Sequence, residues 1–345
     1  METHNALALP ENTLRPFLWV EQQSCALRTR AGLPGIPAGD IPGLPLVIAA
    51  GNKDVDLSAW MSENRAELRQ LLRKCGGILF RGFGIRSSGD FKALVTQWSG
   101  RQMEYFDQTS PRSLIDDAVY TSTDYPSDQR IKMHNELSYA HRWPLEIFFF
   151  CVQPADAGGE TPIADCRKVL SKLSKRTLEK FSAKGVMYVR NMIDGLGLSW
   201  QRVYQTDDPE KVNAHCTRNG IRFAWKGEDH LKTVWTRPAV GKHPVTGEAT
   251  WFNHAYFYNI LSTNPLLLDL VDDKDELPFN TYYGDGSEIE PEVIEEIGGA
   301  FDNTRVTFTW ETGDLLLLDN MLTAHGRSSY TGQRKVLVSM CEPVF

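Results

Sequence analysis

The sequence predicts a mixed α/β fold dominated by β-structure, a β-sandwich or jelly roll with helices inserted between its strands. Segments with strand character stand near both ends of a long stretch, at residues 134–139, 147–152, 306–310, 315–318 and 335–340. Helical segments fill the interval between the two groups, at residues 167–184, 209–218 and 291–301. This order suits a sandwich in which the first and last strands meet in space.

The first part of the chain is predicted to add an arm, two helices and a strand to this body. Residues 1–50 are rich in Pro and Gly, and we expect an extended arm there. Apolar side chains recur at spacings of three and four over 56–75, which predicts a helix ended by the Gly-Gly pair that follows. A strand is predicted at 77–83, and Ser88 is predicted to cap a helix that runs to about residue 98.

The length of 345 residues exceeds the usual size of one domain, but jelly rolls with helical insertions often reach it as single units. We therefore expect one domain over 1–345. It would comprise an N-terminal arm and helix at 1–75 and a core at 76–345, with helical insertions at about 167–220 and 288–303.

Composition and charge exclude several classes of protein. The net charge of -7 opposes the positive field that a phosphate backbone needs, so no nucleic-acid partner is expected. The longest apolar stretch falls far short of the ~20 residues that span a bilayer, and no secretory signal is visible. We therefore expect a cytoplasmic protein with no membrane association. Six cysteines without a CxxC pair predict reduced, buried thiols.

His134 and Glu136 are the first candidates for metal binding. Residues two apart on a strand point to the same face, so their side chains can hold one ion together. The pair is weak alone, because with eight histidines and 44 acidic residues roughly one such spacing is expected by chance. The alternative is a surface strand that carries two polar groups.

His325 supplies a third ligand. It follows the apolar run 315–318, where a buried strand is predicted to end and a loop to begin. Functional groups are commonly placed where a rigid strand gives way to a loop. Two histidines and one carboxylate that leave three positions open on one side form the facial triad of non-heme Fe(II) oxygenases. The pattern therefore predicts an iron site at His134, Glu136 and His325.

The other histidines lack a second ligand two residues further along the chain. We expect most of them to be surface or hydrogen-bonded residues: His4, His141, His215, His230 and His243. His254 differs because it stands within an aromatic segment, WFNHAYF at 251–257. It is interpreted either as a hydrogen-bonded core histidine or as a group that lines a substrate pocket.

Two further residues could hold an organic co-substrate. An iron centre that activates O2 needs electrons, and 2-oxoglutarate supplies two by oxidative decarboxylation. Arg334, at the head of an apolar strand, offers a planar fork that suits the far carboxylate of 2-oxoglutarate. Thr161, which follows a Gly-Gly-Glu segment, could add a hydroxyl donor. Arg334 could also be an ordinary charge at a strand edge, and a Gly pair by itself marks only a turn.

Together these residues resemble the taurine dioxygenase (TauD/TfdA) family of Fe(II)- and 2-oxoglutarate-dependent oxygenases. The resemblance runs from about residue 76 to 341. It rests on separated motifs: HNELSY at 134–139, GGETPIAD at 158–165, GDLLLLDN at 313–320, and HGR at 325–327 continuing to GQR at 332–334. Within the family the chain is most similar to the SyrP-like and clavaminate-synthase-like branch. That branch acts on amino acids in secondary metabolism, either free or loaded on carrier proteins.

The resemblance implies a double-stranded β-helix, which is a jelly roll flanked by helices. It also implies that His134, Glu136 and His325 bind Fe(II), and that Thr161 and Arg334 bind 2-oxoglutarate. Glu136 stands where taurine dioxygenase has Asp, a departure that the branch shares. Halogenase relatives have a small residue there instead, so halogenation is disfavoured. No second arginine of the kind that binds the taurine sulfonate is found, so a sulfonate substrate is not expected.

The implied reaction is hydroxylation of an unactivated carbon of an amino-acid-like substrate, with release of succinate and CO2. The same chemistry can also desaturate, cyclise or epoxidise a substrate. The placement of the substrate in the site decides among these outcomes. Four residues are candidates for the substrate pocket, together with segment 122–130: Tyr139, Arg142, His254 and Arg327. The two arginines are candidates for a substrate carboxylate, although each could equally be structural. Arg327 is also a rival to Arg334, because the interval between His325 and Arg334 is shorter than in taurine dioxygenase.

Two other classes of function keep part of this pattern. A Zn(II) hydrolase can also use two histidines and a carboxylate, but the chain has no HExxH segment, and hydrolysis gives no reason for Thr161 and Arg334. A jelly-roll binding module that has lost catalysis would show a damaged triad. The triad is intact in this sequence, which favours the oxygenase.

Overall fold

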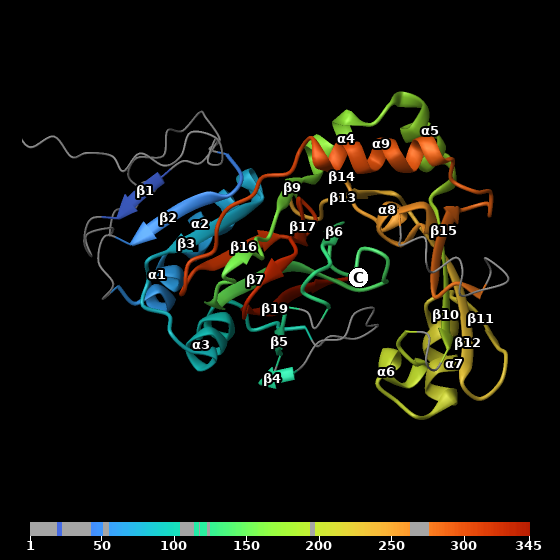
Figure 1. Ribbon diagram of the computed structural model, residues 1–345, viewed down its shortest axis with the longest axis horizontal. Coiled ribbons are helices and arrows are strands. Elements are labelled where there is room, and N and C mark those ends of the chain that lie inside the picture. Colours follow the sequence, from blue (N-terminus) through green and yellow to red (C-terminus); the bar gives the residue numbers. More distant parts are fainter. Residues whose placement is uncertain are drawn as a thin grey trace, which may run out of the picture.

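The computed structural model describes residues 19–22, 43–50, 55–103, 114–116, 118–122, 125–193, 197–262 and 276–345. A large and a small β-sheet form the body of the molecule, and a side lobe with its own sheet stands next to them (Figure 1). The predicted mixed α/β class with dominant β-structure is confirmed. Most of the arm predicted at 1–50 lies outside the described residues. Two of its described segments, 19–22 and 46–50, contribute strands to the large sheet.

The large sheet contains eight strands in the described part of the chain. Their spatial order is β1 (Trp19–Gln22), β2 (Leu46–Ala50), β3 (Gly77–Arg81), β16 (Leu315–Asp319), β7 (Trp143–Gln153), β19 (Lys335–Val344), β5 (Val119–Thr121) and β4 (Leu114–Asp116). The first three run parallel, and the other pairings are antiparallel. β7 therefore lies between β16 and β19, which follow it by more than 150 residues. This is the meeting of early and late strands that the sequence predicts.

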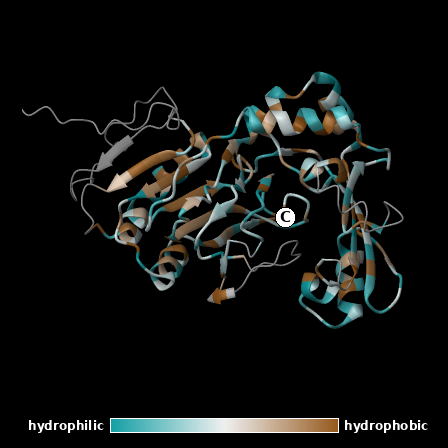
Figure 2. Cartoon of the chain, in the orientation of Figure 1, coloured by the Kyte–Doolittle hydropathy of each residue, from teal (hydrophilic) through white to brown (hydrophobic). Residues whose placement is uncertain are grey.

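The small sheet has three strands, in the order β6 (Ile131–His134), β17 (Thr323–Arg327) and β9 (Ile163–Asp165). The side chains of β16 alternate between the two faces of the large sheet and therefore enter two different hydrophobic cores. The small sheet packs on the inner face. Leu316 and Leu318 join the inner cluster together with Ala324 of the small sheet, whereas Leu315 and Leu317 join the outer cluster. Figure 2 shows the resulting hydrophobic colour along the central strands of the large sheet.

Three helices supply the other side of the outer cluster: α1 (Leu57–Glu63), α2 (Arg65–Cys75) and α3 (Ser88–Trp98). The single helix predicted at 56–75 is wrong, since Asn64 divides it. The Asn64 side chain donates to the Trp60 carbonyl and competes with the helical hydrogen bonds. Gly76 ends α2 in the left-handed conformation, as predicted. The N-cap of α3 is Ser87 instead of Ser88. Ser87 and Asp90 form a capping box, in which the side chain of each accepts the backbone N–H of the other.

The side lobe contains a four-stranded antiparallel sheet that the sequence analysis did not predict. Its order is β11 (Arg222–Trp225), β12 (His230–Arg237), β10 (Val186–Ile193) and β15 (Phe279–Tyr283). The helices α6 (Trp200–Tyr204) and α7 (Pro209–Arg218) lie at the end of this lobe in Figure 1. The helix predicted at 209–218 is confirmed, whereas the one at 167–184 is two helices, α4 (Cys166–Lys172) and α5 (Lys175–Lys184).

The remaining elements are short strand pairs and helices. They are the hairpin of β13 (Val240–Lys242) and β14 (Ala249–Trp251), the short pair of β8 (Ala157–Gly158) and β18 (Tyr330–Thr331), the helices α8 (Ala255–Tyr258) and α9 (Pro291–Asp302), and the 3-10 turn η1 (Ile260–Ser262). α9 confirms the helix predicted at 291–301. It packs against α4 and α8 (Figure 1).

Two predicted strands are wrong. The strand predicted at 134–139 ends at its first residue, since β6 stops at His134 and Leu137 has a φ of 55°, outside the range of a strand. The segment 306–310 makes only one bridge, between Val306 and Ile163, and otherwise has no strand partner among the described residues.

Among the residues that the structure describes, no helix is long and apolar enough to cross a membrane. The five cysteines in this part of the chain are free and buried, as the sequence predicts: Cys75, Cys151, Cys166, Cys216 and Cys341. Cys25 lies outside the described residues.

Candidate metal centre

Strand pairing brings the two predicted histidine ligands together. His134 ends β6 and stands opposite His325 in the middle of β17, and their ring centroids are 4.5 Å apart. Glu136 lies two residues beyond the end of β6. One ligand atom from each of these three residues lies within 4.8 Å of the others, so the group could hold a metal ion. The predicted position of His325 just past a strand is wrong, because it lies inside the next strand.

The hydrogen bonding of His134 leaves the correct nitrogen available for a metal. Its Nδ1 lies 2.9 Å from the Lys132 carbonyl oxygen, which can only accept, so Nδ1 carries the proton and Nε2 carries the lone pair. Glu136 and His325 are 5% and 4% exposed, and His134 is half-buried. Two imidazoles and one buried carboxylate, with an approach from the His134 side, fit the donor set of a non-heme Fe(II) site.

The second predicted pair, Arg334 and Thr161, also meets in the structure. The Arg334 guanidinium donates from Nε to the Gly159 carbonyl at 2.7 Å, and its terminal nitrogens reach Ser122 Oγ at 3.3 Å and Thr161 Oγ1 at 3.4 Å. Thr161 Oγ1 also accepts from the Trp310 indole at 3.1 Å. Gly159 has a φ of 73°, and a Cβ there would lie 3.0 Å from Arg334 Cδ. The Gly pair therefore makes room for Arg334 in addition to making a turn.

The surroundings of Arg334 suit an anionic ligand. All of these partners are neutral, and within the described ranges no carboxylate forms an ion pair with it. Burial, followed by the nearby charge of Arg327, lowers the pKa of Arg334 to about 10, so the group stays charged at neutral pH. A partly buried cation without an ion-pair partner is stabilised by a carboxylate that enters the site.

Arg327, the rival of Arg334, has a different set of partners. Its two terminal nitrogens donate to the carbonyl oxygens of Tyr125, at 2.8 Å, of Gln129, at 2.6 Å, and of Pro126. Arg327 thus fastens the loop before β6 to the strand that carries His325. These contacts favour Arg334 as the residue that can receive the co-substrate.

One wall of the metal centre is aromatic and comes from α8 and the residue before it. The His254 ring lies 5.8 Å from the His134 ring, and the Phe257 ring, which is half-buried, lies 4.7 Å from it. His254 Nδ1 and Ser138 Oγ share a hydrogen bond of 2.6 Å. Burial, followed by the charges of His134 and Lys132, holds the pKa of His254 well below its usual value. His254 is therefore a neutral hydrogen-bonding group next to the triad.

The other predicted pocket residues are not equally close to the triad. The buried Tyr139 ring packs 4.9 Å from the His254 ring, behind it as a second layer, and the Tyr139 carbonyl accepts from the Trp235 indole. Arg142 is exposed and lies over the ring of the C-terminal Phe345. The sequence analysis did not single out Phe257. This residue stands in a run of aromatic residues, and no signal in the sequence distinguishes it from the others.

The comparisons with known proteins identify the family of the chain. Residues 40–341 match the family described as "Taurine catabolism dioxygenase TauD, TfdA family". The chain is 34% identical over 312 residues to the dapdiamide synthesis protein DdaC of Enterobacter agglomerans, covering 88% of this chain and 94% of that protein. It is 26% identical over 285 residues to a clavaminate synthase-like protein of Arabidopsis thaliana, covering 80% and 84%.

Solved structures share the fold. An asparagine oxygenase, in complex with Fe(II), a 3-hydroxyasparagine and succinate, superposes with a TM-score of 0.51 at 15% identity, covering 82% of this chain and 79% of that one. The PvcB protein of Pseudomonas aeruginosa gives a TM-score of 0.50 at 16% identity, covering 87% and 85%. These likenesses confirm the jelly-roll fold. The chain belongs to the TauD/TfdA family, and it is an Fe(II)- and 2-oxoglutarate-dependent dioxygenase.

Proposed function

We propose that this dioxygenase hydroxylates an unactivated carbon of an amino acid or an amino-acid-derived substrate, either free or tethered to a carrier protein. His134, Glu136 and His325 would hold the Fe(II), and Arg334 and Thr161 would hold 2-oxoglutarate. The observation that carries the proposal is the meeting of the three ligand side chains within 4.8 Å. A half-buried arginine, whose hydrogen-bond partners among the described residues are all neutral and include Thr161, supplies the second half of the site.

Each residue has a definite task in this proposal. Bound Fe(II), with 2-oxoglutarate and O2, supplies the oxidising power to cleave a C–H bond, and succinate and CO2 are released. Glu136 contributes the negative charge that two neutral histidines lack, which favours a divalent cation. Arg334 accepts the far carboxylate of the co-substrate in its fork, and Thr161 can donate its hydroxyl to the same group.

The substrate class rests on relatives and on the aromatic wall. DdaC is named for the synthesis of dapdiamides, and the asparagine oxygenase was solved with a hydroxylated amino acid. In this chain His254 offers a neutral hydrogen-bonding group and Phe257 an apolar surface on one side of the triad. Arg327 donates to three carbonyl oxygens of the loop before β6, and Arg142 is exposed and lies over the Phe345 ring. We leave them out of the proposed pocket.

The test is anaerobic reconstitution with Fe(II) and 2-oxoglutarate, followed by O2 exposure in the presence of individual amino acids. We expect one class of amino acid to stimulate succinate formation, and we expect its product to gain one oxygen atom by mass spectrometry. A product that has lost two hydrogens instead would establish desaturation or cyclisation. If free amino acids are all silent and carrier-loaded ones are active, the substrate is tethered. Silence of both would contradict the proposed substrate class.

A further inference from the structure

The buried side chain of Asn320 is bonded to the backbone of a proposed metal ligand. Its Oδ1 accepts the Glu136 N–H at 2.8 Å, and its Nδ2 donates to the Glu136 carbonyl at 2.9 Å and to the Pro144 carbonyl at 2.9 Å. Asn320 has no exposed surface. Since β6 ends at His134, no strand fixes Glu136, and the amide of Asn320 takes the place of a neighbouring strand.

The backbone of Asn320 extends this attachment. Its carbonyl accepts from the Asn135 side chain at 2.6 Å, and its N–H donates to the Leu145 carbonyl at 2.8 Å. Asn135 and Glu136 are therefore both hydrogen-bonded to Asn320, which directly follows β16. The left-handed conformation of Leu137 comes next, so the fixed segment is short and sharply bent.

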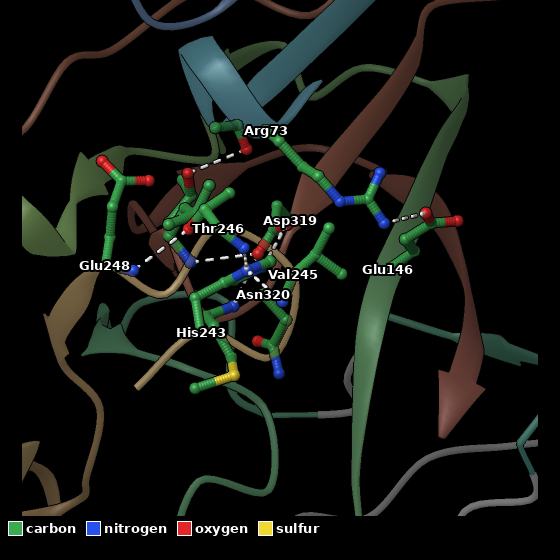
Figure 3. Close-up of polar contacts among 12 residues, drawn as sticks. Arg73, Glu146, His243, Val245, Thr246, Glu248, Asp319 and Asn320 are labelled. Atoms are coloured by element: carbon green, nitrogen blue, oxygen red, sulfur yellow. Dashed lines mark hydrogen bonds and ion pairs between the residues drawn. The ribbon is translucent and has the colours of Figure 1, made fainter. Parts of the chain in front are cut away.

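The neighbouring Asp319 closes the turn that leads to the third proposed ligand. Its Oδ1 accepts the N–H groups of Met321 and Leu322, both at 3.1 Å, and the strand β17 with His325 begins at the next residue. Its Oδ2 lies 2.9 Å from His243 Nε2 (Figure 3). One turn thus sets the backbone of Glu136 and the start of the strand that holds His325.

His243 supports this turn from another part of the chain. Its Nδ1 accepts the N–H groups of Val245 and Thr246 at 3.1 and 3.0 Å, so that nitrogen carries no proton. The neutral ring therefore donates from Nε2 to the Asp319 carboxylate, and Figure 3 shows the three groups around it. Both His243 and Asp319 are 1% exposed, so the hydrogen bond is shielded from water.

We propose that Asn320 is a positioning residue for the metal centre, with Asp319 and His243 holding the turn on which it stands. The proposal rests on the assignment of Glu136 as a metal ligand in the proposed function. Without the Asn320 amide, the Glu136 N–H and the carbonyl groups of Glu136 and Pro144 would each lose a buried hydrogen bond. Glu136 would then leave its place opposite the two histidines, and a metal would have to restore it at a cost in affinity.

The experiment measures the affinity of the full-length protein for Co(II), which is followed by its absorption spectrum in the absence of 2-oxoglutarate. We expect Asn320→Ala to weaken Co(II) binding about 10-fold to 100-fold, the usual effect of losing a group that orients a ligand. The matched control is Asn253→Ala. Asn253 is also buried and is bonded to the backbone at both ends, to Ala239 and Ala255, with no contact to a ligand. Both variants should lower the melting temperature, but only Asn320→Ala should lower metal affinity.

A double-mutant cycle with Glu136→Ala separates positioning from general loosening of the fold. Where Glu136 has no carboxylate, Asn320→Ala should change Co(II) affinity by less than about two-fold. An equal loss in both backgrounds, or unchanged affinity in the single variant, would overturn the proposal. Asn320→Ser, which leaves room for a water, repeats the test if the alanine variant does not fold. Unchanged affinity in Glu136→Ala itself would instead remove the ligand assignment, so the two failures are distinguishable.

Discussion

The two sides of the metal centre are built in different ways. On one side, His134 and His325 face each other on paired strands of the small sheet, which is packed on the large one. On the other side, His254 and Phe257 belong to a four-residue helix and the residue before it. That segment rests on the side lobe, since the His254 N–H donates to the Tyr188 hydroxyl of β10.

Under the proposed function, this difference separates the residues that carry the chemistry from those that select the substrate. Backbone hydrogen bonds across strands fix the two histidines, so their geometry depends little on individual surface residues. The aromatic wall depends on packing, because Tyr258 of α8 stacks on Phe279 of β15 at 4.4 Å. Changes within the lobe can therefore alter the wall and leave the metal ligands in place. We expect substitutions on the two sides to affect different measured quantities.

The largest effect is expected at the strand-borne ligands. His134→Ala or His325→Ala should abolish stoichiometric Fe(II) uptake and succinate formation, because the two remaining ligands hold the ion poorly. The control is His230→Ala in the side lobe, where His230 is bonded to Asn191. It should bind one Fe(II) as the unmodified protein does. Near-normal iron uptake in either ligand variant would remove that residue from the site.

The co-substrate anchor should show the next largest effect. Arg334→Gln removes the charge of a half-buried guanidinium, whose contact with a carboxylate is worth roughly 2 to 4 kcal/mol, or about thirty-fold to several hundred-fold in the KM for 2-oxoglutarate. Fe(II) affinity should stay nearly unchanged. Arg327→Gln should lower stability through the loop 125–129 and change this KM much less. The opposite ranking of the two variants would make Arg327 the anchor.

The sequence predicts the residue types of this site better than the geometry that unites them. The three proposed ligands lie close together, and so do Arg334 and Thr161. The argument that placed His134 and Glu136 on one face of a strand is wrong, because the strand ends between them. Asn320 could not be assigned a role, since its partner Glu136 lies 184 residues away in the chain and only the folded sheet brings the two together.

The side lobe was missed for a different reason. Its strand β12, with the sequence HLKTVWTR, alternates between more and less buried residues, which is the period-2 signal of a strand. The helical segments on either side suggested an insertion made of helices alone. The lobe has its own sheet, and this sheet supports the wall formed by His254 and Phe257.

Gly159 allows a finer test of the Arg334 site. Gly159→Ala would place a Cβ 2.9 Å from Ala155 Cβ and 3.0 Å from Arg334 Cδ, so the Arg334 side chain has to shift. We expect the KM for 2-oxoglutarate to rise about ten-fold, which corresponds to ~1.4 kcal/mol. Gly247→Ala is the matched control, because its φ of 74° is the same within a degree but the nearest atom to its Cβ is 3.9 Å away. Both variants carry the strain of a left-handed residue, and only Gly159→Ala should change this KM.

The smallest effect is expected at the aromatic wall. It should appear in the coupling between consumption of 2-oxoglutarate and formation of product, and not in the binding of the metal or co-substrate. Phe257→Leu keeps an apolar side chain but removes the ring 4.7 Å from His134. A substrate held less firmly presents its target carbon less often, so more 2-oxoglutarate is consumed for each product formed, by about two-fold to ten-fold.

Tyr256→Leu is the control, since Tyr256 is equally half-buried but packs toward Gly298 and Phe301 of α9. The measurement is the ratio of succinate to oxidised product by mass spectrometry, with Fe(II) affinity determined in parallel. An unchanged ratio in Phe257→Leu, or the same change in both variants, would show that the wall does not place the substrate, and the division between a chemical side and a selective side would fail.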